Sequence, residues 1–110
     1  MTITEEKINE LTNKGFSRWT KAGKDRLYIN ATTLGLSYCK YNTGNIRSAA
    51  FGGSEISNAE ARRMLSSKTY IDLVLGTIVS DNATLASAAA ELSGLECEEH
   101  NYWDTIIKIV

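Results

Sequence analysis

Histidine and cysteine are scarce in this chain, and their scarcity excludes several kinds of active site. His100 is the only histidine among 110 residues, so one chain cannot form a histidine-based metal centre or a mechanism that needs two histidines. Cys39 and Cys97 are the only cysteines. A single pair without close spacing is no disulfide framework, and even with His100 it lacks the paired ligands of a zinc site. We therefore expect two reduced thiols and no bound metal.

The sequence also lacks the groupings that catalysis needs. A cysteine nucleophile would require His100 beside it, and the glutamates around Cys97 would raise the pKa of that thiol rather than lower it. No spacing pairs two carboxylates across a cleft, and the turns at Gly23 and Gly52-Gly53 lack the glycine pattern of a phosphate loop. We therefore expect a protein that binds rather than an enzyme, with no catalytic residues and no cofactor.

An excess of one charge and a long apolar run are missing as well. The sequence has 12 basic and 13 acidic residues, and the resulting net charge of −1 gives no overall field to attract nucleic acid or an anionic membrane. The longest apolar stretch, Ile71 to Val79, is interrupted by Asp72 and Gly76, so no membrane span is expected. The polar start of the chain is unlike a signal peptide. These features predict a cytoplasmic protein in which any basic binding site is local.

Size and composition are those of one globular domain, taken as residues 1–110. Hydrophobic residues make up 43% and charged residues 23% of the sequence, and no proline, low-complexity segment or repeat marks a linker. Helical and strand patterns both occur along the chain. The fold class predicted is α+β, with an antiparallel sheet built from successive hairpins and two or three short amphipathic helices.

Three segments carry the signals of helix ends, a capping residue at the start or a glycine after the last turn. The predicted helices are residues 3–14 (Thr2 and Glu5 as capping box, Gly15 after the end), 57–67 (Ser57 and Glu60 as capping box) and 82–93 (Asp81 or Asn82 as cap, Gly94 after the end). The last one is rich in alanine. This composition either reflects helix propensity alone or leaves a thin helix suited to a subunit contact.

Aromatic and β-branched residues on either side of turn-forming residues predict strands that pair as hairpins. The predicted pairs are 16–20 with 26–30 around the turn Lys21–Asp25, 37–41 with 46–51, and 69–74 with 77–79. These segments would give a sheet of up to six strands. The apolar positions of residues 102–110 fit a strand and also fit a helix, and we expect a strand.

Basic and aromatic residues are interleaved on the first predicted hairpins. Strand alternation puts Arg18 on one face and Trp19 on the other, and Tyr41, Arg47 and Phe51 lie on the strands that follow. Such an arrangement can stack a nucleobase and neutralise phosphate. The alternative is that Trp19 and Phe51 are core residues.

The start of the second predicted helix offers a second place for an anion. Ser57 and Asn58 open that helix, and free N–H groups at a helix start attract negative charge. Arg62 and Arg63 follow and point about 100° apart, so both cannot face the core. Arg63 is placed to pair with Glu60, whereas Arg62 is equally suited to a ligand and to the solvent.

Six segments between residues 15 and 72 together resemble small proteins encoded by phages and prophages of Firmicutes. They are Gly15–Lys21, Asp25–Asn30, Leu34–Leu36, Asn42–Ile46, Phe51–Gly53 and Ile56–Arg63. Within that group the chain is similar to the first Thoeris anti-defense family, phage proteins that sequester the cyclic ADP-ribose isomer made by bacterial TIR-domain enzymes. The resemblance implies a homo-oligomer, a dimer or higher, that captures a cyclic nucleotide in the host cell cytoplasm without cleaving it.

The leading hypothesis is therefore a protein that sequesters a nucleotide signal. Its candidate ligand-binding residues are Arg18, Trp19, Tyr41, Arg47, Phe51, Ser57, Asn58 and Arg62. Aromatic rings would stack the base, and the arginines with the helix start would hold the phosphates. A second hypothesis is a phage inhibitor of the anti-CRISPR type, which would bind a host protein through its acidic C-terminal region. No nucleic-acid partner is expected.

Overall fold

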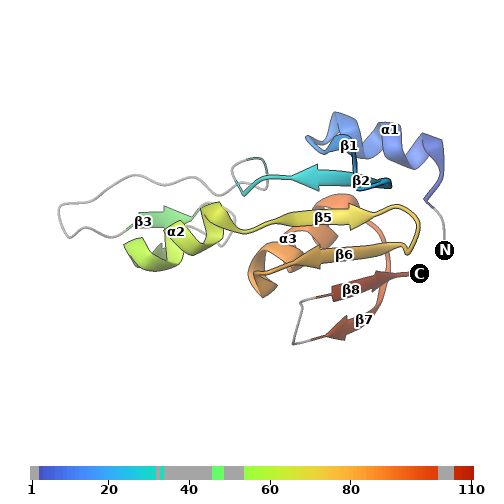
Figure 1. The fold of residues 1–110 in the computed structure, drawn as a ribbon. Helices are drawn as coiled ribbons and strands as arrows, with labels where there is room; N and C mark the ends of the chain where they lie inside the picture. The colour runs from blue at the N-terminus through green and yellow to red at the C-terminus, as the bar shows by residue number, and fades with distance from the viewer. Residues whose placement is uncertain (1–2, 32, 34–45, 49–53, 102–105) are drawn as a thin grey trace.

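The computed structural model describes residues 3–31, 33, 46–48, 54–101 and 106–110. Six strands form an antiparallel sheet with the order β1-β2-β5-β6-β8-β7, and β3 pairs with β4 in a small second sheet (Figure 1). The elements are α1 (Glu5–Asn13), β1 (Ser17–Lys21), β2 (Lys24–Ile29), β3 (Ile46–Ser48), β4 (Ser54–Ile56), α2 (Asn58–Ser66), β5 (Thr69–Asp72), β6 (Thr77–Ser80), α3 (Ala83–Ser93), β7 (Cys97–Asn101) and β8 (Ile106–Ile109). The predicted α+β fold class is confirmed.

The first helix and hairpin form close to where the sequence placed them. Thr4, not Thr2, caps α1, because the Thr4 hydroxyl accepts a hydrogen bond from the Lys7 amide at 3.2 Å. Gly15 follows the helix with a φ of +107°, and a Cβ at this position would collide with the methyl group of Thr33. The backbone therefore turns sharply from α1 into β1.

The turn between β1 and β2 is shorter than predicted. Ala22 and Gly23 both have positive φ values, 52° and 75°. A two-residue turn of this kind matches the twist of the strands it joins. Lys21 consequently pairs directly with Lys24, and the five-residue turn expected at 21–25 is wrong.

The second predicted hairpin is only partly tested. Segment 37–41 lies outside the described residues. Ile46 pairs with Ile56 in the β3–β4 sheet, so residues 46–48 join a strand that the sequence did not predict. Ser54–Ile56 is three residues long and has one apolar side chain, which is too little for an alternating pattern to be recognised.

The C-terminal half contains one confirmed hairpin, one confirmed strand and one strand that was missed. The pairing of β5 with β6 is as predicted, and the tail forms the strand β8 rather than a helix. The missed strand, β7, is polar along most of its length and lies at the edge of the sheet, where little apolar surface is buried. The sheet has six strands as expected, but β7 and β8 occupy the positions given to the second hairpin.

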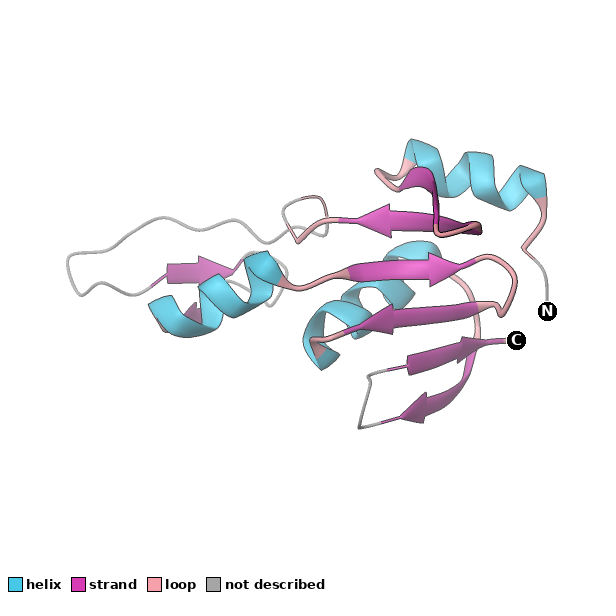
Figure 2. Cartoon of the chain, in the orientation of Figure 1, coloured by secondary structure: helices cyan, strands magenta, loops and turns pink. Residues whose placement is uncertain are grey.

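One face of the six-stranded sheet carries the core. Leu27, Ile71, Ile78 and Ile107 stand opposite one another on β2, β5, β6 and β8, and all four are buried. Helix α3 lies against this face, as Figure 2 shows, and α1 adds Ile8 and Leu11 to the same core. Asn82 caps α3 by accepting hydrogen bonds from two backbone amides, and Gly94 ends it with a φ of +64°. None of the described helices is long and apolar enough to cross a membrane.

Candidate ligand-binding site

The other face of the sheet is open and carries a basic and aromatic surface. Side chains alternate along each strand, so the residues between the core positions all point to this second face. Two rows cross it in register: Trp19, Arg26, Asp72, Thr77 and Lys108, and beside them Ser17, Tyr28, Tyr70, Val79 and Ile106. In Figures 1 and 2 no described helix lies over β5, β6 and β8 on this side. The open face is therefore the larger accessible surface of the sheet.

Arg26 lies at the centre of this surface, between aromatic rings. Its guanidinium carbon is 4.4 Å from the centroid of the Tyr70 ring, and the rings of Tyr28 and Tyr70 are 5.5 Å apart. A hydrogen bond with the Tyr28 side chain raises the pKa of Arg26, and partial burial opposes this shift. The Nε atom of Arg26 is buried and has no hydrogen-bond partner among the described residues. Arg26 is thus a cation packed against the Tyr70 ring, with one buried donor that no described residue satisfies.

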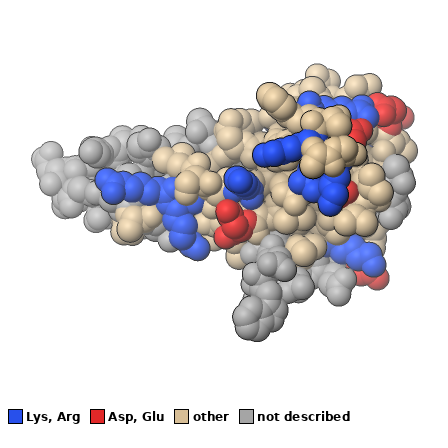
Figure 3. All heavy atoms as spheres, viewed as in Figure 1, with Lys and Arg blue, Asp and Glu red and all other residues tan. Residues whose placement is uncertain are grey.

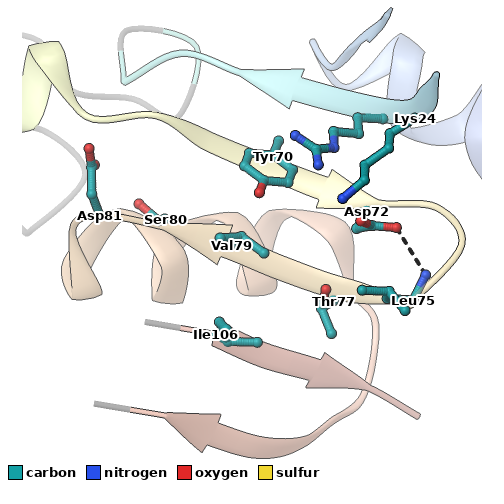
Figure 4. Close-up of a pocket in the computed structure, with 10 residues that line it drawn as sticks. Lys24, Tyr70, Asp72, Leu75, Thr77, Val79, Ser80, Asp81 and Ile106 are labelled. Atoms are coloured by element: carbon teal, nitrogen blue, oxygen red, sulfur yellow. Dashed lines mark hydrogen bonds between the residues drawn. The ribbon is translucent and has the colours of Figure 1, made fainter. Parts of the chain in front are cut away.

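A pocket of about 530 Å³ opens beside Arg26 (Figure 4). It is lined by Lys24, Arg26, Tyr70, Asp72, Leu75, Thr77, Val79, Ser80, Asp81 and Ile106, and we call it the Tyr70 pocket. Val79 and Ile106 give it an apolar floor, and Lys24 and Arg26 give it two cations. This combination of apolar surface and a few polar groups is typical of small-molecule sites.

Both acidic residues of the Tyr70 pocket are engaged elsewhere. One carboxylate oxygen of Asp72 accepts hydrogen bonds from the amides of Val74 and Leu75, each at 3.0 Å, as the dashed line in Figure 4 marks for Leu75. Asp81 accepts a hydrogen bond from the Lys68 amide at 3.0 Å. The two carboxylates stabilise turns but keep their negative charge, and Asp72 stands directly opposite Arg26, so a ligand meets two cations and two carboxylates in this pocket.

A second pocket of about 330 Å³ lies on the same face, on the other side of the tyrosine pair. It is lined by Gly15, Ser17, Trp19, Tyr28, Ile29, Asn30, Ser67, Lys68 and Thr69, and we call it the Trp19 pocket. Trp19 keeps 62% of its surface exposed, so the interpretation of this residue as part of the core is wrong. Figure 3 shows lysine and arginine side chains over the β2 region of this face and over α2.

Arg18 does not share a site with Trp19. Its guanidinium donates to Glu5 of α1 at 2.9 Å and to Asp25 of β2 at 2.6 Å. The two carboxylates raise the pKa of Arg18 and occupy the donors that a phosphate would need. The predicted pair is separated because neighbouring residues of a strand point to opposite faces.

Among the remaining predicted residues, those that the structure describes line neither pocket. Tyr41 and Phe51 lie outside the described residues. Arg47 stands opposite Glu55 in the β3–β4 sheet. Ser57, Asn58 and Arg62 are at the start and on the body of α2, and neither the Tyr70 pocket nor the Trp19 pocket has a lining residue from α2. Arg62 and Arg63 are both exposed, which confirms that they do not both face the core.

Sequence reasoning missed the residues that form the Tyr70 pocket. Arg26 and Tyr28 are two residues apart on a predicted strand, so their common face could be recognised from the sequence. Tyr70 could not be added to them, because its position opposite Tyr28 depends on the pairing of β2 with β5, and these two strands are far apart in the sequence. The sequence signal available for this pocket is the alternation of side chains along one predicted hairpin, which puts Arg26 and Tyr28 on one face.

The described cysteine, Cys97, lines neither pocket. Cys97 is a free, exposed thiol on β7, and partial burial raises its pKa, which favours the unreactive thiol form. Cys39 lies outside the described residues. Among the residues that the structure describes, no group of three His, Cys, Asp or Glu side chains could hold a metal ion.

No family model, no curated protein and no solved structure matches this chain.

Proposed function

We propose that the protein binds a nucleotide on the open face of its sheet and sequesters it without converting it. The observation that carries this proposal is Arg26, which is packed against the Tyr70 ring at 4.4 Å and lines a pocket of about 530 Å³. A nucleotide is both flat and anionic. A fixed cation beside an aromatic ring and an apolar floor matches both properties.

The lining residues suggest how the ligand would lie. The apolar side chains of Val79 and Ile106 and the ring of Tyr70 would contact the base. Lys24 and Arg26 come from the same strand two residues apart, so their charges point to the same side of the sheet. Together they would hold one or two phosphate groups at the β2 wall of the pocket.

The described lining residues favour binding over turnover. General acid and base catalysis requires a side chain that is free to exchange a proton with the ligand. The carboxylates of Asp72 and Asp81 accept hydrogen bonds from backbone amides instead. The resemblance in sequence supports a cyclic ADP-ribose isomer as the ligand and the cytoplasm of an infected cell as the place of action.

Self-association remains part of this proposal, but α3 offers less to it than the sequence suggested. Ala86 and Ala89 are completely buried against the sheet, so they explain how α3 approaches the core closely. Only Ala83 is exposed among the alanines of this helix, while Ala88 and Ala90 are half-buried. A subunit contact through α3 would therefore have little alanine surface to use.

The proposal is tested by incubating the protein with a panel of cyclic nucleotides that includes cyclic ADP-ribose isomers. The protein is then separated from free ligand and heated, and the released compound is identified by chromatography. Recovery of the intact nucleotide supports sequestration. Recovery of a converted product shows an enzyme, and no retention of any nucleotide contradicts the proposal and favours the protein-binding inhibitor.

Two arginine variants of β1 and β2 make this test specific for the open face. Arg26→Gln removes a charge-assisted contact and is expected to weaken nucleotide retention about tenfold or more. Arg18→Gln is the matched control, because it removes the same charge from the opposite face of the sheet. Equal losses in the two variants would show that the nucleotide does not bind beside Arg26.

A further inference from the structure

The open face has two separate pockets where a single nucleotide needs only one. The Tyr70 pocket and the Trp19 pocket have no lining residue in common, and the contact between the Tyr28 and Tyr70 rings separates them. Each pocket contains aromatic surface and one lysine: Tyr70 with Lys24 in the first, and Trp19 and Tyr28 with Lys68 in the second. The surface therefore repeats the same combination of stacking ring and cation.

The register of the strands places Arg26 between these two combinations. Arg26 stands directly opposite Trp19 on the neighbouring strand, and Tyr70 is on the next strand beyond it. With strands about 4.8 Å apart, Trp19 and Tyr70 are carried by strands about 10 Å apart. One base cannot stack on both rings at this separation, whereas two bases joined through a phosphate can, with the phosphate beside Arg26.

The exposure of Trp19 is the second reason to assign it to a ligand. An indole that leaves 62% of its surface in water contributes little to the fold, and β1 is an edge strand with every residue exposed. The short turn at Ala22-Gly23 and five register pairs with β2 hold the strand in place. Trp19 is thus an exposed ring on a fixed backbone, as in proteins that stack the bases of single strands.

We infer that the open face binds single-stranded nucleic acid of at least two nucleotides. One base lies in the Tyr70 pocket, the next stacks on Trp19, and the phosphate between them lies at Arg26. This inference rests on the proposed nucleotide binding at the Tyr70 pocket and extends it across the sheet. The net charge of −1 does not oppose it, because Lys24, Arg26 and Lys68 outnumber the carboxylates of Asp72 and Asp81 among the residues that line the two pockets.

The test is a length series of thymidine oligonucleotides, measured by competition against a fluorescein-labelled octanucleotide in fluorescence anisotropy. The competitors are the 5′-mononucleotide, the dinucleotide with a 5′-phosphate, the tetranucleotide and the octanucleotide. We expect affinity to rise about tenfold or more from one nucleotide to two, because one stacked base adds that much. Further lengthening should add less, since the two pockets are then filled.

Trp19→Ala tests whether the second base stacks on Trp19 while the first base lies in the Tyr70 pocket. The variant should lose the gain from one nucleotide to two, while its affinity for the mononucleotide stays within about twofold of wild type. Tyr70→Ala should weaken binding of both. Because Trp19 is exposed, Trp19→Ala should melt within a few degrees of wild type, and this measurement keeps the binding result interpretable.

The outcomes separate this inference from the proposed function. If the mononucleotide binds and the dinucleotide binds no better, the inference is wrong and the proposed function stands. If neither competes and no labelled oligonucleotide binds, the inference is wrong, and the cyclic-nucleotide panel decides the proposed function separately. If Trp19→Ala converts an oligomer into a monomer, Trp19 is a subunit contact and the inference fails.

Discussion

The two faces of the six-stranded sheet are made from alternate residues of the same strands, yet they differ in composition and in partners. The covered face presents aliphatic side chains in a row from Leu27 to Ile107 and packs against α1 and α3. The open face presents Trp19, Arg26 and the tyrosine pair, and the described helices leave it accessible. The residues that stabilise the fold and those of the proposed binding site thus lie on separate surfaces, and substitutions should separate their effects.

Charge is distributed differently on the two sides as well. Arg18 at the edge of the covered face is held by two carboxylates, so its charge is compensated within the protein. Arg26 on the open face packs on the Tyr70 ring, is hydrogen-bonded to the Tyr28 side chain and stands opposite a single carboxylate, Asp72. A compensated arginine stabilises the fold locally. An arginine held by rings remains able to attract an anion.

The largest difference between the faces is expected for aliphatic truncation. Leu27→Ala removes a completely buried side chain from the centre of the core row and should lower the free energy of unfolding by about 2–5 kcal/mol. Val79→Ala, on the half-buried open face, should cost less than about 1.5 kcal/mol. Denaturant unfolding of both variants measures the contrast. Equal costs would mean that the open face is covered in the folded protein.

A smaller difference in the free energy of unfolding is expected for two hydroxyl residues of β6, one on each face of the sheet. On the covered face the Ser80 hydroxyl lies 2.9 Å from that of Thr69, and it accepts a hydrogen bond from the Asn82 amide at 3.1 Å. All three residues are buried, so Ser80→Ala leaves groups without partners and should cost about 1–3 kcal/mol.

Thr77→Val is the control for Ser80→Ala, since Thr77 points to the open face of the same strand. Its effect on the free energy of unfolding should stay within about 0.5 kcal/mol. A Ser80→Ala variant as stable as wild type would show that water or rearrangement satisfies Thr69 and Asn82.

The parts of the fold that the sequence predicted are those with local signals. Gly15 and Gly94 mark helix ends through positive φ values, and Asn82 provides a cap. Hairpins between neighbouring segments were found because their strands alternate. Strands β4 and β7 lack such a pattern, and pairings such as β2 with β5 join distant segments. The formation of these strands and pairings depends on how much surface the whole sheet buries, and no local sequence pattern encodes that amount.

The sequence predicted the types of residue in the candidate site, basic and aromatic, but it did not identify most of the residues themselves. Trp19 is on the surface where basic and aromatic residues gather, whereas Arg18, next to it in sequence, is on the other side. Alternation alone predicts that separation. If all ligand contacts must lie on one face of the sheet, the arginine that accompanies Trp19 is Arg26 rather than Arg18. Tyr70 could be added only from the register of the sheet.

The smallest effect is expected at the ion pairs of Arg18, and it should depend on pH. The Arg18 guanidinium donates two hydrogen bonds to Asp25 and holds the pKa of that carboxyl below its usual value of about 3.9. A carboxyl whose pKa is lowered by folding adds stability above its unfolded pKa and loses it as the pH falls through the folded value. Because both groups are exposed, solvent screening keeps this contribution small.

Arg18→Gln should therefore melt slightly below wild type at pH 7, and the difference should shrink as the pH falls below about 4. Added salt at pH 7 should also reduce it, since exposed charges are screened. Melting curves from pH 7 to pH 2 measure the effect. A difference that is constant over this range would mean that Arg18 contributes by packing on α1 rather than by its charge. Arg18 and Arg26 would then be shown to differ only in ligand binding. In that measurement Arg18→Gln is expected to bind the ligand as tightly as wild type.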